Sequence, residues 1–287
     1  MGARFDQHVV GVRDDVYPTL LRQIHDPPER LFVGGSNVAL LQKRMVALVG
    51  ARSCSSYGRQ VARTLARALA EAGAVIVSGL ARGVDTEAHR GALDVGGATI
   101  AVLGCGIDVV YPARNRQLAE RICEGGLLIS EYPDTTPAAP WRFPARNRII
   151  AGVAFATIVV EARERSGALI TADFALESGR EVLAVPGEIT SSRSAGTNAL
   201  IRYGATPVGS ISELVGDLGF EVAAPRASNS SDAERRLIEA IESGATTFDD
   251  LGRALDLEPA ALSSRITELE LAGQLEAVDG HYRATAI

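Results

Sequence analysis

The 287-residue sequence contains little lysine, histidine or cysteine, and it has no long hydrophobic run. Its longest nearly apolar stretch, residues 149–160, is shorter than the roughly 20 residues needed to cross a bilayer. The first residues include Arg4, Asp6 and Arg13 but no apolar segment, which argues against a signal peptide. We therefore expect a cytoplasmic protein with no membrane partner.

The three cysteines, Cys54, Cys105 and Cys123, are odd in number and show no Cys-x-x-Cys spacing. This pattern predicts reduced thiols and argues against a disulfide framework or a zinc site. The sequence also lacks Gly-x-Gly-x-x-Gly after its first predicted strand, and Gly-x-x-x-x-Gly-Lys-[Ser/Thr] throughout. A dehydrogenase or an ATPase is thus disfavoured, and we expect neither a cofactor nor a metal.

Candidate catalytic residues are few. Asp85 and His89 lie four residues apart on a predicted helix, where they would share a face for metal binding or acid–base chemistry. A structural hydrogen bond is the simpler explanation of this pair. Glu161 follows a predicted strand and is a candidate general base. Because no complete catalytic set is visible, we expect a protein that is not an enzyme.

What the sequence does contain is an alternation of short apolar runs with helical patterns. The runs are mostly β-branched and bounded by glycine, as buried parallel strands are. They cover residues 46–49, 75–77, 99–103, 127–129, 157–160 and 182–185. Predicted helices cover residues 58–72, 85–93, 114–123, 146–153, 171–177 and 197–203. This order predicts an α/β fold with a Rossmann-like, doubly wound and mostly parallel sheet, which binds ligands beyond the carboxyl ends of its strands.

Composition divides the chain into four parts. Residues 1–44 contain breaker signals around their prolines and read as an N-terminal arm with one short strand at 31–33. Residues 45–217 form the Rossmann-like domain, and residues 218–230 read as a linker of small and polar residues. Residues 231–287 show three helical patterns, up to 243, at 248–255 and at 259–271, and then a hairpin at 275–284. Three helices and a hairpin predict a small winged-helix domain.

Glycine-rich turns follow four of the predicted strands. They lie at residues 50–53, 78–83, 166–168 and 186–187, the last with a second turn at 194–198. Glycine lets a backbone approach a phosphate closely, and a helix N-terminus supplies N–H donors. Tight turns in any α/β domain also need glycine. Four such turns, two of them with arginine, favour an anion site.

Arginine is concentrated in residues 141–148, which read Trp-Arg-Phe-Pro-Ala-Arg-Asn-Arg. Pro144 indicates a helix start, where cations are unfavourable unless an anion binds. Phe143 and Trp141 offer faces on which unpaired bases stack. Alternatively, the two aromatic residues lie in the core and the arginines pair with Glu161 and Glu131. Because Lys43 is the only lysine, codon usage also explains the choice of arginine.

Seven motifs in order resemble the DprA/Smf family of DNA-processing proteins. They read VALVGARSCSSYG, VSGLARGVDTEAHRGAL, VLGCGIDVVYP, SEYP, FPARNRIIAG, VVEARERSGALITADFALESGREVLAVPG and SAGTNALIRYGA. The resemblance implies a modified Rossmann-like fold that binds single-stranded DNA without cutting it. It also implies an accessory protein of natural transformation and recombination that protects incoming single strands, loads RecA recombinase and forms homodimers.

The resemblance and the residue patterns together give a predicted DNA site. The family's Gly-x-Arg and Phe-Pro-x-Arg-Asn-Arg motifs map onto Gly50, Arg52, Phe143, Arg146, Asn147 and Arg148, and the later motifs onto Ser166, Gly167, Thr171, Gly196 and Asn198. The turn and the arginine-rich segment add Ser53 and Arg142. The sequence departs from the family in its short N-terminal segment, in Ala168, where serine is common, and in a missing glycine within residues 133–140.

An alternative is a nucleotide-processing enzyme related to the phosphoribohydrolases once labelled lysine decarboxylases. Their signature, Pro-Gly-Gly-x-Gly-Thr-x-x-Glu, is expected in the region of the third turn. The sequence has Ser-Gly-Ala-Leu-Ile-Thr at residues 166–171 instead.

The net charge of −6 seems at odds with a nucleic-acid partner. However, residues 226–287 hold six arginines and twelve carboxylates, whereas residues 1–225 are balanced with 23 groups of each sign. The predicted recognition helix carries Glu258, Glu268 and Glu270 against Arg265. We therefore expect the winged-helix domain to contact protein and the neutral α/β body to bind DNA.

Overall fold

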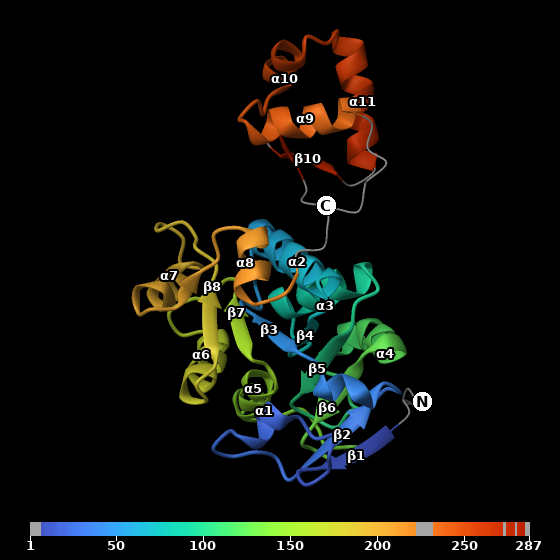
Figure 1. Cartoon of the computed structure of the whole chain (residues 1–287), viewed down its shortest axis with the longest axis vertical. Helices are drawn as coiled ribbons and strands as arrows, with labels where there is room; N and C mark the ends of the chain where they lie inside the picture. The colour runs from blue at the N-terminus through green and yellow to red at the C-terminus, as the bar shows by residue number, and fades with distance from the viewer. Residues whose placement is uncertain (1–6, 222–231, 272–273, 279, 285–287) are drawn as a thin grey trace. The chain divides into compact units, whose positions relative to one another are not determined.

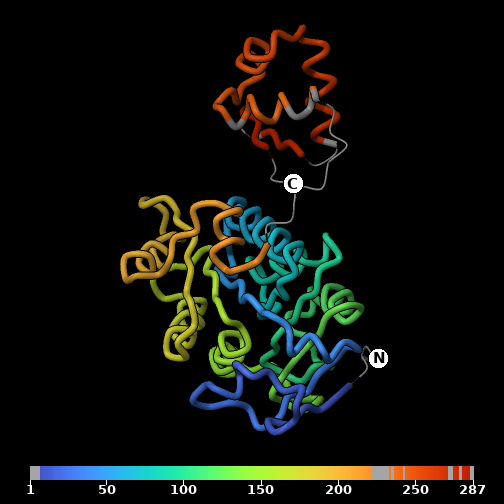
Figure 2. The backbone as a smooth tube through the Cα atoms, viewed as in Figure 1, coloured from blue at the N-terminus to red at the C-terminus, as the bar shows by residue number. Residues whose placement is uncertain are grey.

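The computed structural model describes residues 7–221, 232–271, 274–278 and 280–284. The chain divides into two compact units, residues 1–222 and 223–287, and each is considered by itself. Figure 2 traces the backbone of both from blue at the N-terminus to red at the C-terminus. No helix within the described residues is long and apolar enough to span a membrane.

The first unit is built on a nine-stranded sheet with the order β1-β2-β6-β5-β4-β3-β7-β8-β9 (Figure 1). All neighbouring strands from β6 to β9 pair in parallel, whereas β1 pairs with β2, and β2 with β6, in antiparallel fashion. From β3 the chain builds outward through β4, β5 and β6, and then returns to add β7 on the other side of β3. This confirms the doubly wound, mostly parallel fold. The bounds are β1(Gln7–Gly11), β2(Arg30–Gly34), β3(Met45–Val49), β4(Val75–Ser78), β5(Thr99–Leu103), β6(Leu127–Ser130), β7(Ala156–Val159), β8(Glu181–Ala184) and β9(Thr206–Pro207).

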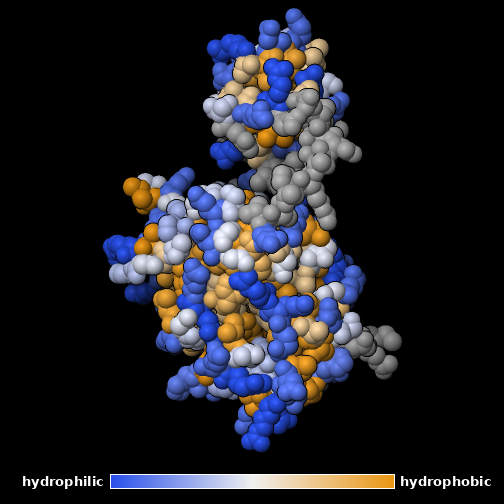
Figure 3. Space-filling view, in the orientation of Figure 1, coloured by the Kyte–Doolittle hydropathy of each residue, from blue (hydrophilic) through white to orange (hydrophobic). Residues whose placement is uncertain are grey.

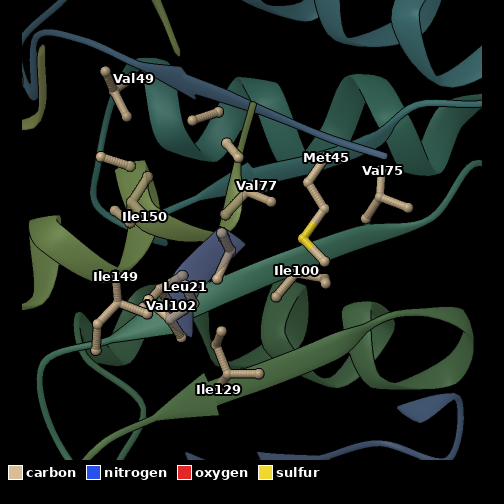
Figure 4. Close-up of a cluster of buried hydrophobic side chains, with 14 of the residues drawn as sticks. Leu21, Met45, Val49, Val75, Val77, Ile100, Val102, Ile129, Ile149 and Ile150 are labelled. Atoms are coloured by element: carbon tan, nitrogen blue, oxygen red, sulfur yellow. The ribbon is translucent and has the colours of Figure 1, made fainter. Parts of the chain in front are cut away.

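Helices cover both faces of the sheet. Alternate residues of β3 divide between them: Val46 and Leu48 pack under one layer, and Met45, Ala47 and Val49 under the other. The first layer holds α2(Ser56–Glu71), α3(Val84–Asp94), α4(Arg116–Gly125) and α8(Ile211–Asp217). The second holds α1(Thr19–Arg22), α5(Arg142–Val153), α6(Gly167–Glu177) and α7(Ala195–Arg202). Figure 4 shows Ile149 and Ile150 of α5 packed with strand residues and with Leu21 of α1.

Residues 7–44, expected as an arm, contribute to this core. Their strands β1 and β2 extend the sheet beyond β6, as the blue segment of Figure 2 shows. Tyr17, Leu21 and Leu31 are fully buried, and the Tyr17 hydroxyl donates a 2.8 Å hydrogen bond to the carbonyl of Pro28. The segment also holds the 3-10 helix η1(Val38–Gln42). Because residues 7–44 are packed in this way, they cover one edge of the α/β unit.

Helices α5 and α6 both begin four residues earlier than expected, α5 at Arg142 and α6 at Gly167. In α5, Pro144 lies inside the first turn, where its missing N–H costs no helical hydrogen bond. In α6, the Ser166 hydroxyl caps the helix by accepting a 3.3 Å hydrogen bond from the backbone of Ala168. Both helix starts therefore lie at the carboxyl edge of the sheet.

A cation–aromatic contact fixes the end of the first unit. The Arg44 guanidinium lies 4.6 Å from the ring centre of Phe155 and 4.4 Å from that of Phe220. It also donates hydrogen bonds of 2.6 and 2.8 Å to the carbonyls of Leu218 and Gly219. Residues 218–221, expected as the start of the linker, are thus anchored to the amino end of β3.

The second unit is the expected winged helix. Its helices α9(Asp232–Glu242), α10(Phe248–Leu255) and α11(Pro259–Leu271) precede an antiparallel pair, β10(Leu275–Val278) and β11(His281–Ala284). Leu237, Leu251 and Leu262 are fully buried at its centre. The Thr247 side chain caps α10 as expected, accepting from the backbone of Asp250 at 3.2 Å. The expected cap Ser231 and turn residue Asp279 lie outside the described residues.

Candidate nucleic-acid interface

A cavity of about 520 Å³ lies at the carboxyl edge of the sheet where β3 and β7 meet. This is the switch point of the topology, where doubly wound folds bind their ligands. The turn after β3, the loop after β7, the second and third turns of α5 and the first turn of α6 enclose the cavity, which we call cavity 1. Its lining is Val49, Gly50, Ala51, Arg52, Ser53, Ala81, Asp85, Arg146, Asn147, Ile150, Arg163, Arg165, Ser166, Gly167, Ala168 and Thr171.

Cavity 1 is strongly cationic. Four arginines, Arg52, Arg146, Arg163 and Arg165, face a single carboxylate, that of Asp85. Within the part of the chain that the structure describes, no carboxylate lies within 4 Å of the guanidinium of any of these four arginines. Such an excess of like charge in one concave site favours an anionic ligand.

Arg146 is the most deeply placed of the four, with 4% of its surface exposed. Its Nη1 donates to the carbonyl of Gly79 at 2.7 Å and to that of Val102. Burial lowers the pKa of Arg146 to about 10, an effect that Asp85 opposes and that the nearby charge of Arg52 increases. The side chain is therefore still charged at neutral pH, inside the protein and beside a second arginine.

Asp85 and His89 make hydrogen bonds to different partners. The Asp85 carboxylate accepts hydrogen bonds from the backbone of Gly79 (3.1 Å) and Ala81 (3.3 Å), and burial raises its pKa. His89 is instead hydrogen-bonded through Nδ1 to the Thr99 hydroxyl at 2.7 Å, and burial lowers its pKa to about 3. Within the described residues, no cluster of three His, Cys, Asp or Glu side chains offers a metal site.

Arg52 stands at the mouth of cavity 1 beside an aromatic pair. Its guanidinium lies 5.5 Å from the ring centre of Phe143, whose ring centre is 5.3 Å from that of Tyr111. The turn that carries Arg52 packs closely on the turn after β4: a Cβ at Gly83 would lie 2.2 Å from the carbonyl oxygen of Ala51, and Gly83 has φ +78°. Only glycine fits there, so Gly83 holds the two arginine-bearing turns together.

The N-terminus of α6 forms the other wall. The Asn147 side chain donates a 3.0 Å hydrogen bond to the carbonyl of Gly167, joining α5 to α6. Thr171 is buried, and its hydroxyl donates back to the same carbonyl at 3.4 Å. Apart from its chain neighbours and the backbone of α6, no atom lies within 4 Å of the position that a Cβ would take at Gly167, so the helix start is open to a ligand. Backbone N–H groups at such a start suit a phosphate.

Two of the arginines expected in the site lie elsewhere. Arg148 makes a double hydrogen bond to Glu131, both at 2.8 Å, and a 3.2 Å contact with Asp26. This is the alternative pairing with Glu131 that the sequence left open. Arg142 donates to the carbonyl of Pro137 and stacks on Tyr132 and Trp141, at 4.8 and 4.9 Å from the ring centres. Neither residue lines cavity 1.

Glu161 pairs with no arginine within the described residues. Its carboxylate accepts hydrogen bonds from the backbone and the hydroxyl of Ser55 at the start of α2, at 2.9 and 2.5 Å. This contact stabilises a helix N-terminus, and it accounts for the buried carboxylate without a role as a general base.

Gly196 and Asn198 support the site from outside it. A Cβ at Gly196 would lie 2.7 Å from the carbonyl oxygen of Ala162. The Asn198 side chain accepts from the backbone N–H of Gly187 at 3.2 Å and donates to its carbonyl at 3.0 Å. These two residues fix the loops after β7 and β8.

Sequence reasoning missed Arg163 and Arg165 as members of the site. Both follow β7, a strand whose end was predicted, and both precede the third glycine turn. Their position directly after a predicted strand was therefore enough to place Arg163 and Arg165 in the site, because the carboxyl ends of parallel strands meet at one edge of the sheet.

This geometry defines a Rossmann-like α/β protein with a cationic cavity at the switch point of its sheet, and the comparison with known proteins agrees with that class. A family model described as DNA recombination-mediator protein A matches residues 8–219, and one described as the DprA winged helix domain matches residues 221–281. The chain therefore belongs to the DprA/Smf family of DNA-processing proteins.

Relatives match over most of their length. The chain is 46% identical to the DNA processing protein DprA of Streptococcus pneumoniae over 209 residues, 73% of each chain. It is 38% identical to protein Smf of Escherichia coli over 289 residues, which cover 96% of this chain and 77% of that protein.

Solved structures of two family members are similar to this chain over about three quarters of its length. S. pneumoniae DprA gives a TM-score of 0.71 at 44% identity, over 76% of this chain and 75% of that one. Helicobacter pylori DprA gives 0.69 at 32% identity, over 76% and 98%. The latter structure is described as giving insight into a single-stranded DNA binding mode.

Proposed function

We propose that the protein binds single-stranded DNA in cavity 1 as a non-catalytic accessory factor of natural transformation and recombination. The observation that carries this proposal is the balance of four arginines to one carboxylate in a cavity at the switch point of the sheet. Membership of the family, and the single-stranded DNA binding described for H. pylori DprA, support the same ligand. Family membership is also the support for the further steps, protection of incoming strands and loading of RecA in the cytoplasm.

The aromatic pair beside Arg52 favours an unpaired strand over a duplex. Phe143 is partly exposed, and Tyr111 has half of its surface exposed. Bases stack on such rings when they are not paired, and each stacked base contributes roughly 1–3 kcal/mol. The bases of a duplex are already stacked on one another and do not reach these rings.

The chemistry of cavity 1 supports binding without catalysis. Its one carboxylate, Asp85, is occupied by two backbone N–H groups. The hydroxyls of Ser166 and Thr171 are likewise engaged within α6, by hydrogen bonds to Ala168 and Gly167. Release of ribose phosphate from a nucleoside monophosphate by the purified protein would contradict this part of the proposal and support the phosphoribohydrolase alternative.

The proposed homodimer has a candidate surface around α6, α7 and the edge strand β9. Large hydrophobic side chains are exposed there: Leu176 is 55% exposed, Ile189 96% and Tyr203 78%. Hydrophobic residues are visible at the surface beside α7 on the left of Figure 3. Light scattering of Leu176→Glu tests this surface, because a charge in a dimer interface shifts the mass to that of a monomer.

Fluorescence anisotropy with labelled oligo-dT and its duplex, titrated at several salt concentrations, tests the DNA proposal. We expect preference for the single strand and an affinity that falls steeply with salt, because each neutralised phosphate releases counterions. Arg163→Ala/Arg165→Ala should lower the affinity about tenfold or more, whereas Arg13→Ala/Arg121→Ala, with the same loss of charge outside the cavity, should not. Equal affinity of all three proteins would overturn the site.

A further inference from the structure

A second cavity of about 480 Å³ shares Arg52 and Ser53 with cavity 1. It is bounded by the turns after β3 and β4, by the first turns of α2 and α3, and by the 3-10 helix η2(Ala113–Asn115). We call it cavity 2. Its lining is Arg52, Ser53, Cys54, Arg59, Arg82, Gly83, Thr86, Glu87, Arg90, Arg114 and Asn115.

The charge of cavity 2 is as one-sided as that of cavity 1. Five exposed arginines, Arg52, Arg59, Arg82, Arg90 and Arg114, surround it with one carboxylate, that of Glu87.

Glu87 is already neutralised by Arg90 at 2.8 Å and by Arg63 at 3.8 Å. Among the residues that the structure describes, no carboxylate lies within 4 Å of the guanidinium of Arg59, Arg82 or Arg114. Arg59 contacts only a neutral group there, donating to the carbonyl of Cys54 at 3.2 Å.

A third, smaller cavity of about 340 Å³ shares lining residues with both of these sites. It shares Arg52 and Arg146 with cavity 1, and Arg52, Arg82 and Arg114 with cavity 2. Its remaining lining includes the aromatic pair Tyr111 and Phe143. Arg52 therefore borders all three spaces, and the arginines form a continuous series from Arg165, past Arg52, to Arg90.

We propose that cavity 2 is a second phosphate-binding site, which holds the continuation of the strand bound in cavity 1. The inference rests on the proposed function and extends it: the backbone of one single strand passes Arg52 and enters cavity 2, while a base between the two sites lies against Tyr111 and Phe143. Solvated surface arginines need no such arrangement. Five arginines that line one cavity with a single, already paired carboxylate repel one another unless an anion occupies the cavity.

Strand length separates the two sites in an experiment. A short oligo-dT of about 6 nucleotides fills cavity 1 with its aromatic neighbours, whereas one of about 20 nucleotides also reaches cavity 2. The variant Arg59→Ala/Arg90→Ala alters two residues that line cavity 2 and not cavity 1. Full-length protein is titrated with both labelled lengths by anisotropy, at several salt concentrations.

We expect the variant to bind the long strand about tenfold more weakly and the short strand within twofold of wild type. Its plot of log affinity against log salt for the long strand should be less steep by about 1, because it neutralises one or two fewer phosphates. Arg59→Lys/Arg90→Lys keeps both charges and should restore most of the affinity. Arg13→Ala/Arg121→Ala is the control for lost charge.

Three outcomes would overturn the inference. If the variant binds both strand lengths as tightly as wild type, cavity 2 holds no part of the strand. If its affinity for both lengths falls equally, the substitutions have damaged the fold or cavity 1 instead. Failure of the lysine variant to recover affinity would show that charge is not what cavity 2 supplies. Wild-type protein that binds neither length contradicts the proposed function itself, which the cavity 1 variants test separately.

Discussion

The guanidinium of Arg146 occupies the space where residue 79 would carry a side chain. A Cβ at Gly79 would lie 2.5 Å from Nη1 of Arg146 and 2.6 Å from Nη2. The same Nη1 donates to the carbonyl of Gly79, so the glycine both admits the arginine and binds it. A turn that looked like a phosphate loop in the sequence thus serves first to hold a buried cation in cavity 1.

Gly79→Ala should therefore displace Arg146. Overpacking of a close-packed interior costs about 1–3 kcal/mol, and we expect thermal or urea unfolding to report a loss of that size. Single-strand affinity should fall as well, because Arg146 leaves its place in the cavity. Gly125→Ala is the matched control, since no atom beyond its own helix and chain neighbours lies within 4 Å of its Cβ position, and it should lower neither stability nor affinity. A fully stable Gly79→Ala protein would contradict the packing described.

Arg146 and Arg148 should differ sharply when replaced. Arg148 pairs with Glu131, and both side chains are mostly buried. We expect Arg148→Ala to destabilise the protein by about 1–2 kcal/mol, between the values of exposed and buried ion pairs, and to leave single-strand affinity within twofold. Arg146→Lys, which keeps the charge but not the fork, should lower affinity. Anisotropy and urea unfolding on the same samples separate the two effects, and a DNA-binding defect confined to Arg148→Ala would refute the assignment.

His89 should make the stability of the α/β unit depend on pH. Its pKa is about 3 in the folded protein against 6.5 for an ordinary histidine, because burial disfavours the cation. The unfolded chain therefore takes up a proton that the folded chain does not, and stability is lost as pH falls below 6.5. The loss approaches 1.4 kcal/mol per pH unit, or about 2 kcal/mol between pH 6.5 and 5. Urea unfolding of His89→Gln across this range should show a shallower dependence than wild type; equal slopes would count against the mechanism.

Deletion of residues 226–287 should leave single-strand affinity within twofold. The deleted part carries six arginines and twelve carboxylates, so it would repel the phosphates of a strand. Every residue that lines cavity 1 or cavity 2 lies before residue 172. Anisotropy of the truncated and full chains with the same oligo-dT decides the matter, and a large loss of affinity on truncation would assign the winged helix a direct part in binding.

The sequence predicts the sheet well because its strands carry their own evidence. Runs such as residues 46–49 and 99–103 are β-branched, apolar and bounded by glycine, and each is a strand of the structure within one residue or so. Residues 7–44 were harder to interpret. The short strand predicted at 31–33 lies within β2, where Leu31 and Val33 are fully buried, but the prolines and polar residues around it concealed β1 and the packing of the segment on the core. Breaker residues mark turns, but they do not show whether the segment between them packs on a core.

The location of cavity 1 and most of the residues that line it were predictable, but which arginines of the segment 141–148 face the cavity was not. Arg146 and Arg148 belong to one motif, yet residues two apart on a helix point about 200° away from each other. One therefore enters cavity 1 and the other meets Glu131, 17 residues earlier in the chain. Such a choice depends on long-range neighbours, which spacing within a motif does not reveal.

The anchoring of Phe220 by Arg44 has a practical consequence. Arg44 precedes β3 and Phe155 precedes β7, whereas cavity 1 lies after the last residues of these same strands. The polypeptide accordingly leaves the α/β unit at the amino edge of the sheet, opposite the carboxyl edge that holds the arginines of cavity 1. A fluorophore or a surface tether attached at residue 221 would keep its distance from a bound strand, which makes this position a suitable handle for single-molecule recordings of the protein on DNA.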